Sequence, residues 1–178
     1  MGAIEQFVTG SRLQESEADR VLTTVLFVDV VGSTERASEV GDERWRELLD
    51  RFEETVRGQL VLHRGELINR AGDGVLATFD GPARAIRCAR DIRDTVRRSG
   101  LDVRCGLHTG EVTRRNGDVA GIAVHIGARV SAAASPGEVL VTRTVRDLVA
   151  GSGISFDERG EHSLKGVSEA WALYATSG

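Results

Sequence analysis

Apolar positions in the first third of the chain predict one buried strand followed by two helices. Residues 23–31, TTVLFVDVV, are mostly apolar and β-branched, a pattern typical of a buried strand. GST at residues 32–34 then offers two residue types that favour helix N-caps, which predicts a helix start. From residue 42, apolar side chains recur with the spacing of a second helix, at Trp45, Leu48, Leu49, Phe52 and Val56.

The middle third predicts a β-hairpin, a helix and a further strand. HRGELIN (63–69) and GVLATF (74–79) are short strand candidates, and RAGD between them favours a hairpin. The next helix ends at Ser99-Gly100, a typical C-terminal signal. Its apolar stripe consists of Ile86, Ala89, Ile92 and Val96. LDVRCGLHTGEV (101–112) then has the composition of a strand.

The last third predicts two helices that alternate with strands. Asn116-Gly117 is a strong turn signal. GIAVHIGARVSAAA (121–134) is a mostly apolar helix candidate that stops before a Ser-Pro-Gly sequence. EVLVT (138–142) is the next strand, TVRDLVA (144–150) a short helix, and AWALYA (170–175) the last strand.

The predicted order is β-α-α-β-β-α-β-α-β-α-β, and it determines the expected fold class. Helices interleave with hairpins, not with single parallel strands, which favours an α+β sandwich with helices packed on a mainly antiparallel sheet. Residues 1–20 are polar and acid-rich, and we expect them to form an arm or a linker stub. Residues 21–178 then form one domain, and because residues 1–20 look like a junction, the parent protein is expected to continue N-terminally.

Composition and charge limit the kinds of partner that the chain is expected to bind. The 178-residue chain is 40% hydrophobic, which is enough for one core, and its net charge of −4 argues against a general nucleic-acid binder. No apolar run approaches 18 residues and the N-terminus is not a signal peptide, so we expect a cytoplasmic protein without a membrane anchor. Cys88 and Cys105 lack zinc-site spacing and are expected to be buried thiols.

Two aspartates are candidates for a metal site. Asp29 interrupts an apolar strand, where a carboxylate is costly to bury without a partner, although it could cap the next turn. Asp73 lies between glycines at a predicted hairpin tip, where a plain turn residue is the simpler interpretation. Together the two carboxylates could hold hard cations while phosphate oxygens complete the coordination. The N–H groups that follow Asp29, in GST, would suit phosphates.

Further candidates lie later in the chain. His125 and Arg129 are four residues apart and share a face of the predicted apolar helix, where the arginine needs an anion or an interface. Taken alone, His125 is more often a structural histidine. Asp118 resembles a turn or capping residue, and Lys165 equally suits a solvent-facing turn.

Five segments in order resemble one family. LFVDVVGST, AGDGVLATF, GLHTGEV, DVAGIAVHIGARV and LKGV look like motifs of the class III adenylyl/guanylyl cyclase catalytic domain, in its bacterial, actinobacterial-like branch. The resemblance runs from about residue 21 to residue 175. It implies a ferredoxin-like sheet, a head-to-tail homodimer, a nucleoside triphosphate substrate and two divalent cations, Mg²⁺ or Mn²⁺. Members of this branch are often fused to regulatory domains, so an N-terminal regulatory domain is expected in a longer parent chain.

The resemblance also implies roles for particular residues. Asp29 and Asp73 match the metal-binding aspartates, with the backbone carbonyl of Val30 as a further ligand. Asp118 matches the base-recognising aspartate and Lys165 the phosphate-binding lysine. Arg129 matches the arginine that stabilises the transition state, and Gly32, Ser33 and Thr34 form the expected phosphate cradle.

Two positions depart from the usual family pattern. Asn69 replaces a base-recognising lysine, and His125 replaces an asparagine, as they do in a minority of family members. An ionised Asp118 accepts from the adenine amino group and repels the guanine oxygen, so ATP is the predicted substrate. Asn69 can donate to adenine or accept from guanine, which predicts weaker discrimination than a lysine gives.

Three other functions compete with this interpretation. A nucleotide-binding regulatory domain could keep the fold with little turnover, and a guanylyl cyclase is the closest enzymatic alternative. A receiver-type phosphoacceptor would need single strands that alternate with helices and an acidic pair after its first strand. Neither feature is evident in the sequence.

Overall fold

The computed structural model describes residues 19–71 and 73–178, which are built around one eight-stranded sheet. The strand order is β2-β3-β1-β4-β6-β8-β7, with β5 paired to β4. Among the described residues, every strand pair is antiparallel except β4 with β6. The expected α+β class with a mainly antiparallel sheet is therefore confirmed.

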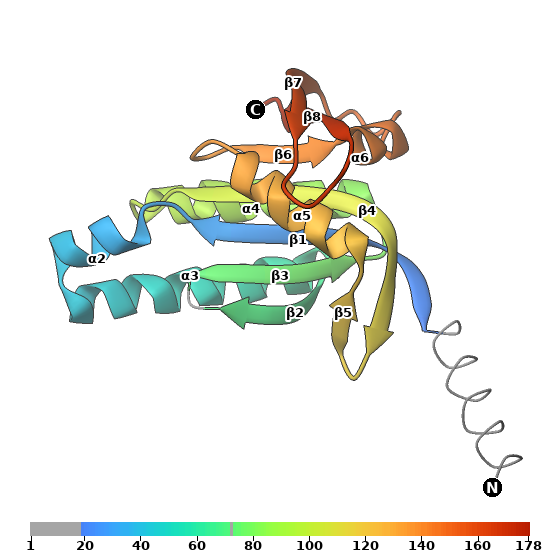
Figure 1. The fold of residues 1–178 in the computed structure, drawn as a ribbon. Helices are drawn as coiled ribbons and strands as arrows, with labels where there is room; N and C mark the ends of the chain where they lie inside the picture. Colours follow the sequence, from blue (N-terminus) through green and yellow to red (C-terminus); the bar gives the residue numbers. More distant parts are fainter. Residues whose placement is uncertain (1–18, 72) are drawn as a thin grey trace, which may run out of the picture.

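The secondary-structure elements follow the predicted order with two additions (Figure 1). The strands are β1 (Arg20–Val30), β2 (Glu66–Ala71), β3 (Gly74–Phe79), β4 (Val103–Arg115), β5 (Asp118–Ala120), β6 (Val139–Thr142), β7 (Phe156–Ser163) and β8 (Ala170–Thr176). The helices are α2 (Ser33–Val40), α3 (Asp42–Leu62), α4 (Pro82–Arg98), α5 (Ile122–Ala133) and α6 (Arg143–Leu148).

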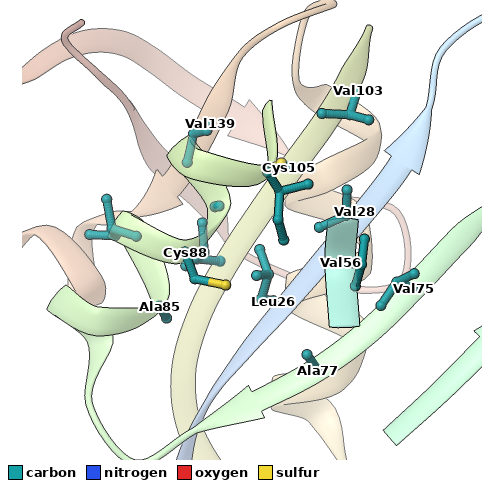
Figure 2. Packing of buried hydrophobic residues seen from close by; sticks show 14 of the residues in the cluster. Leu26, Val28, Val56, Val75, Ala77, Ala85, Cys88, Val103, Cys105 and Val139 are labelled. Atoms are coloured by element: carbon teal, nitrogen blue, oxygen red, sulfur yellow. The ribbon is translucent and has the colours of Figure 1, made fainter. Parts of the chain in front are cut away.

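The sheet carries α3 and α4 on one face and α5 on the other (Figure 1). Alternation along β1 explains this arrangement, because successive side chains of a strand point to opposite faces. Leu26 and Val28 pack into the large core with residues of α3 and α4, whereas Val25 packs in a separate cluster with Ala123 of α5. Figure 2 shows the larger core, where Cys88 of α4 approaches the strands.

Both cysteines are buried and free, as predicted. Burial raises the pKa of Cys88 and of Cys105 to about 12, so both thiols stay protonated at neutral pH. They act as small apolar side chains of the core.

Close contact between α5 and the sheet depends on glycine. A Cβ added to Gly106 of β4 would lie 2.2 Å from the backbone nitrogen of Ser131, and one added to Gly127 of α5 would lie 2.6 Å from Val25. Real Cβ atoms do not come this close, so only glycine at both positions allows α5 to lie where it does.

Three sequence expectations need correction or restriction. The strands β5 and β7 were not predicted, because β5 has only three residues and β7 is a mostly exposed polar segment without apolar alternation. The expected capping by Ser33 and Thr34 is wrong: Gly32, at φ 64°, is the N-cap of α2, and no side chain in residues 19–71 or 73–178 makes a capping hydrogen bond there. Most of the predicted arm, residues 1–18, lies outside the described residues.

Asp29 does not cap the turn that follows it within the described residues; its carboxylate accepts a hydrogen bond from Ser131 of α5 instead. Among the described residues, none of the helices is both long and apolar enough to cross a bilayer.

The packing of α5 leads to a stability prediction. Gly106→Ala should lower the free energy of unfolding by about 1–3 kcal/mol, because the added methyl group forces α5 away from β4. Urea denaturation at neutral pH measures this loss.

Gly58→Ala is the matched control. Gly58 lies inside α3 with no atom within 4 Å of an added Cβ, so this change should stabilise the helix by about 0.5–1 kcal/mol. If Gly106→Ala matched or exceeded the wild type in stability, the proposed close packing of α5 would be wrong.

Candidate functional site

The two aspartates predicted to bind metal meet at one end of the sheet. Asp29 is the second-last residue of β1, and its strand partner on β3 is Gly74, the residue after Asp73. The N–H of Val30 donates a hydrogen bond of 3.0 Å to the backbone carbonyl of Asp73. The hairpin tip is therefore held against the end of β1, which brings together residues 44 positions apart in sequence.

The carboxylate of Asp29 is half-buried and has two polar neighbours. Ser131 of α5 donates a hydrogen bond of 3.1 Å to its Oδ2, and Arg104 is its strand partner on β4. Burial raises the pKa of Asp29, and the nearby charge of Asp73 raises it further. The Ser131 hydrogen bond and the Arg104 charge act in the opposite direction.

This donor set fits a hard divalent cation. Burial is the main cause of the raised pKa of Asp29, and repulsion by the charge of Asp73 adds to it; a bound cation would offset both. Within residues 19–71 and 73–178, no group of three or more His, Cys, Asp or Glu side chains is placed to hold a metal. Two carboxylates leave most coordination positions for a ligand such as a phosphate.

A cleft of about 490 Å³ opens beside Asp73. Ser33 and Thr34, in the first turn of α2, form part of its wall, and Trp45 and Leu49 of α3 line another part. Because no side chain among the described residues caps α2, its first N–H groups are available to bind an anion. The predicted phosphate cradle thus lies next to one of the predicted metal ligands.

A second cavity, of about 180 Å³, contains both Asp29 and Asn69. Phe27 and Leu76 contribute apolar walls. A hairpin residue predicted to recognise a base and a strand residue predicted to bind metal therefore line the same cavity of one chain.

The other predicted residues lie apart from these two cavities. His125 and Arg129 are both exposed on one face of α5, as their spacing predicted. In the part of the chain that the structure describes, Arg129 has no hydrogen-bond or ion-pair partner. Asp118 is exposed at the start of β5 and accepts a 2.8 Å bond from the N–H of Val119, and Lys165 is exposed in the turn before β8.

Sequence reasoning missed Arg104 and Ser131. Arg104 is a charge within an apolar strand segment, a signal that could have been recognised in the same way as Asp29. Its Nε is buried without a hydrogen-bond partner among the described residues. Ser131 had no such signal, because a serine in a helix gives no indication of a partner 102 residues away.

Comparisons with known proteins agree on one family. The model of the adenylate and guanylate cyclase catalytic domain matches residues 14–176. The putative adenylate cyclase 3 of Rhizobium meliloti is 27% identical over 89% of the chain, and an adenylate cyclase of Streptomyces coelicolor is 33% identical over 71% of it. The chain spans 28% and 34% of the lengths of these two relatives.

A solved structure supports the fold. The adenylyl cyclase CyaB from P. aeruginosa superposes with a TM-score of 0.81, which covers 89% of this chain and 95% of that one. Its sequence is 22% identical, so this likeness concerns the fold alone.

The environment of Asp29 leads to a prediction on stability and pH. Folding raises the pKa of this carboxyl above its ordinary value of 3.8, so ionised Asp29 destabilises the folded state. The loss begins as pH rises past 3.8 and is complete above the raised pKa. Asp29→Asn should therefore raise the melting temperature in EDTA at pH 7.5, with a gain that shrinks as pH falls. Calorimetry from about pH 4 to pH 7.5 measures this difference in melting temperature.

Asp157→Asn provides the comparison, because Asp157 is an exposed aspartate on β7. We expect its melting temperature to stay close to that of the wild type at every pH. A lower melting temperature for Asp29→Asn at pH 7.5 would show that this carboxylate stabilises the metal-free fold instead.

Proposed function

The chain belongs to the family of adenylate and guanylate cyclase catalytic domains, and on this basis we propose that it converts ATP to 3′,5′-cyclic AMP and pyrophosphate. The observation that carries the proposal is the Asp29–Asp73 pair, joined through Val30 and placed beside the uncapped start of α2. Such a pair suits the binding of a nucleotide triphosphate with divalent cations.

The reaction is an in-line displacement within one nucleotide. The ribose 3′-oxygen forms a bond to the α-phosphorus and its proton is released, while the bond to the β-phosphate oxygen breaks and pyrophosphate leaves. Asp29, Asp73 and the carbonyl of Val30 would hold two divalent cations, Mg²⁺ or Mn²⁺. When bound, these cations neutralise triphosphate charge and make the 3′-hydroxyl easier to deprotonate.

Residues of the chain bind the phosphates at several points. The free N–H groups at Gly32, Ser33 and Thr34 suit phosphate oxygens, as does the ammonium group of Lys165. The buried guanidinium Nε of Arg104, which has no hydrogen-bond partner within residues 19–71 and 73–178, places a positive charge next to Asp29, where the triphosphate would lie.

Two residues of α5 act on the reacting centre. Arg129 stabilises the charge that grows on the α-phosphate, a contribution that is largest in the transition state. Its planar guanidinium, permanently charged, suits this role. The imidazole of His125 can donate one hydrogen bond to orient the ribose or the phosphate.

Base recognition depends on Asp118 and Asn69. An ionised carboxylate only accepts hydrogen bonds, so Asp118 favours the adenine amino group over the guanine oxygen. The amide of Asn69 can serve either base, so it contributes less to selectivity than a lysine would.

The site is proposed to form between two copies of the chain arranged head to tail. One subunit supplies the metal ligands Asp29 and Asp73. The other supplies the residues that bind and activate the nucleotide, namely Asn69, Asp118, His125, Arg129 and Lys165. The exposed and unpartnered position of Arg129, within the described residues, supports this division, because a free guanidinium on an apolar helix is available to a second subunit.

The second candidate is a nucleotide-binding regulatory domain with little turnover. Asn69 and His125 favour it, since Asn69 replaces the base-recognising lysine and His125 the asparagine that the family usually has. A cyclase with relaxed ATP and GTP selectivity is the intermediate case.

Measurement of cyclic nucleotide formation tests the function and its selectivity. The purified chain, supplied with Mn²⁺ or Mg²⁺, should form cyclic AMP from ATP faster than cyclic GMP from GTP. Asp118→Ala should reduce the ratio of the two kcat/KM values by about tenfold, because one good hydrogen bond to the base accounts for about 1–2 kcal/mol of discrimination. Product separation by chromatography gives both rates.

Glu111→Ala is the control for this measurement, since Glu111 is an exposed carboxylate on β4 that pairs with Arg20. It should leave the ratio unchanged. Equal losses of both activities on Asp118→Ala would refute base recognition by Asp118, and a wild type that binds ATP without forming product would favour the regulatory domain.

Shared sites are tested by mixing inactive variants. Asp73→Ala and Arg129→Ala should each be inactive as homodimers. Their heterodimer should contain one intact site, formed by Asp29 and Asp73 of the Arg129→Ala chain with Arg129 of the Asp73→Ala chain. We expect activity to return to about a quarter of the wild-type value after equimolar mixing, because half the dimers are mixed and each has one site of two.

Mixing Asp73→Ala with Asp29→Ala is the matched control. Both variants lack a metal ligand, so no heterodimer of theirs has an intact site. Recovery in this control, or none in the test mixture, would argue against sites shared between subunits.

A further inference from the structure

Ser131 has an unusual place for a helical serine. It is 1% exposed, on the face of α5 that packs against the sheet. Its hydroxyl lies 3.1 Å from Oδ2 of Asp29 and 3.5 Å from the carbonyl oxygen of Arg104. A hydroxyl has one proton, and the shorter contact is the better hydrogen bond, so Ser131 donates to Asp29.

This hydrogen bond fixes the orientation of the Asp29 carboxylate. A carboxylate has two oxygens, and Ser131 occupies Oδ2 from the side of the helix. Rotation of the carboxylate would break the bond, so the hydroxyl fixes its orientation and leaves Oδ1 free for a cation. Helical serines more often bond to the carbonyl four residues earlier, and here the hydroxyl bonds to a strand instead.

The position of Ser131 is itself tightly determined. Its backbone lies against Gly106, so closely that any Cβ there would collide with it, and Gly127 one turn earlier lies against Val25 and Phe27. The helix cannot shift toward or away from β1 without losing this packing. A short side chain on a fixed backbone gives the hydroxyl little freedom to move.

The opposite face of the same helix carries the predicted catalytic residues. Ser131 follows Arg129 by two positions, which is a rotation of about 200° around a helix. Arg129 therefore points outward while Ser131 points to the sheet, in agreement with their exposed and buried states. In a head-to-tail dimer, α5 of one subunit would serve two sites: Arg129 in one of them and Ser131, through Asp29, in the other.

We propose that Ser131 is a positioning residue that orients the Asp29 carboxylate for the catalytic cation of its own chain. The proposal rests on the proposed cyclase function, because it assigns a role at the same metal site. If Ser131 had a purely structural role, its hydrogen bond to Asp29 would only give the buried hydroxyl a partner. The two roles differ in what they predict for metal affinity.

The test measures Mn²⁺ binding without turnover. Mn²⁺ is titrated by electron paramagnetic resonance into the protein with 3′-deoxy-ATP, which lacks the attacking hydroxyl. Ser131→Ala should weaken Mn²⁺ binding about tenfold, the range expected when a hydrogen-bond partner of a metal ligand is removed. Ser131→Cys keeps a side chain of similar size with a weaker donor, so its loss of Mn²⁺ affinity should be smaller than that of Ser131→Ala. If the alanine variant does not fold, the cysteine variant tests the proposal.

Ser99→Ala is the matched control. Ser99 also donates a side-chain hydrogen bond, to the carbonyl of Val96 at the end of α4, and it lies outside the metal site. Its Mn²⁺ affinity should equal that of the wild type. Wild-type Mn²⁺ affinity in a folded Ser131→Ala protein, or in Ser131→Cys, would overturn the proposal.

The mixed dimers show which chain Ser131 serves. Ser131→Ala added to the Arg129→Ala chain, which supplies Asp29 to the intact site, should raise the Mn²⁺ concentration needed for half-maximal activity about tenfold. The same change added to the Asp73→Ala chain should leave it unaltered. An equal effect on either chain would overturn the proposal, because it would mean that Ser131 acts through Arg129 or through helix packing.

The two levels of inference fail separately. If the wild type binds Mn²⁺ but forms no cyclic nucleotide, the proposed activity is wrong, and the Mn²⁺ affinities still decide the role of Ser131. If the wild type with 3′-deoxy-ATP binds no Mn²⁺, both the metal site and the role of Ser131 are wrong.

Discussion

The close packing of α5 on the sheet is the constraint on which the site depends. Gly106 of β4 and Gly127 of α5 remove the side chains that would separate helix and sheet. As a result Ser131 reaches Asp29, while Arg129 remains on the outer face of the helix. A larger side chain would stabilise the isolated helix or strand at least as well as glycine does. The contact between α5 and the sheet therefore requires these glycines, and the conformation of either element alone does not.

A second constraint joins the two carboxylates. The hydrogen bond from the N–H of Val30 to the carbonyl of Asp73 closes a contact between the end of β1 and the tip of the next hairpin. Half-burial and mutual repulsion raise the pKa of Asp29, so the metal-free site is electrostatically unfavourable. Such a site gains stability when a cation binds, which is the usual relation between functional sites and fold stability.

Much of the fold was predictable from local pattern. Apolar runs, a turn signal and helical apolar spacing located β1, α3, the β2–β3 hairpin and α4, because these elements contribute apolar side chains to the core. The strands β5 and β7 were not predicted, because β5 is very short and β7 is an exposed, polar strand at the edge of the sheet. Their pairing with β4 and β8 depends on backbone hydrogen bonds, which leave no pattern in side chains.

The sequence by itself determined the types of residue available for chemistry: an aspartate in an apolar strand, another between glycines, and a histidine and an arginine one helical turn apart. Residue type and local spacing are enough to identify such candidates. Only the tertiary structure decided that Asp29 and Asp73 meet, that Arg104 and Ser131 are neighbours of Asp29, and that Gly32 is the N-cap of α2. These contacts join positions far apart in the chain, and strand register and helix packing, which local pattern does not encode, bring them together.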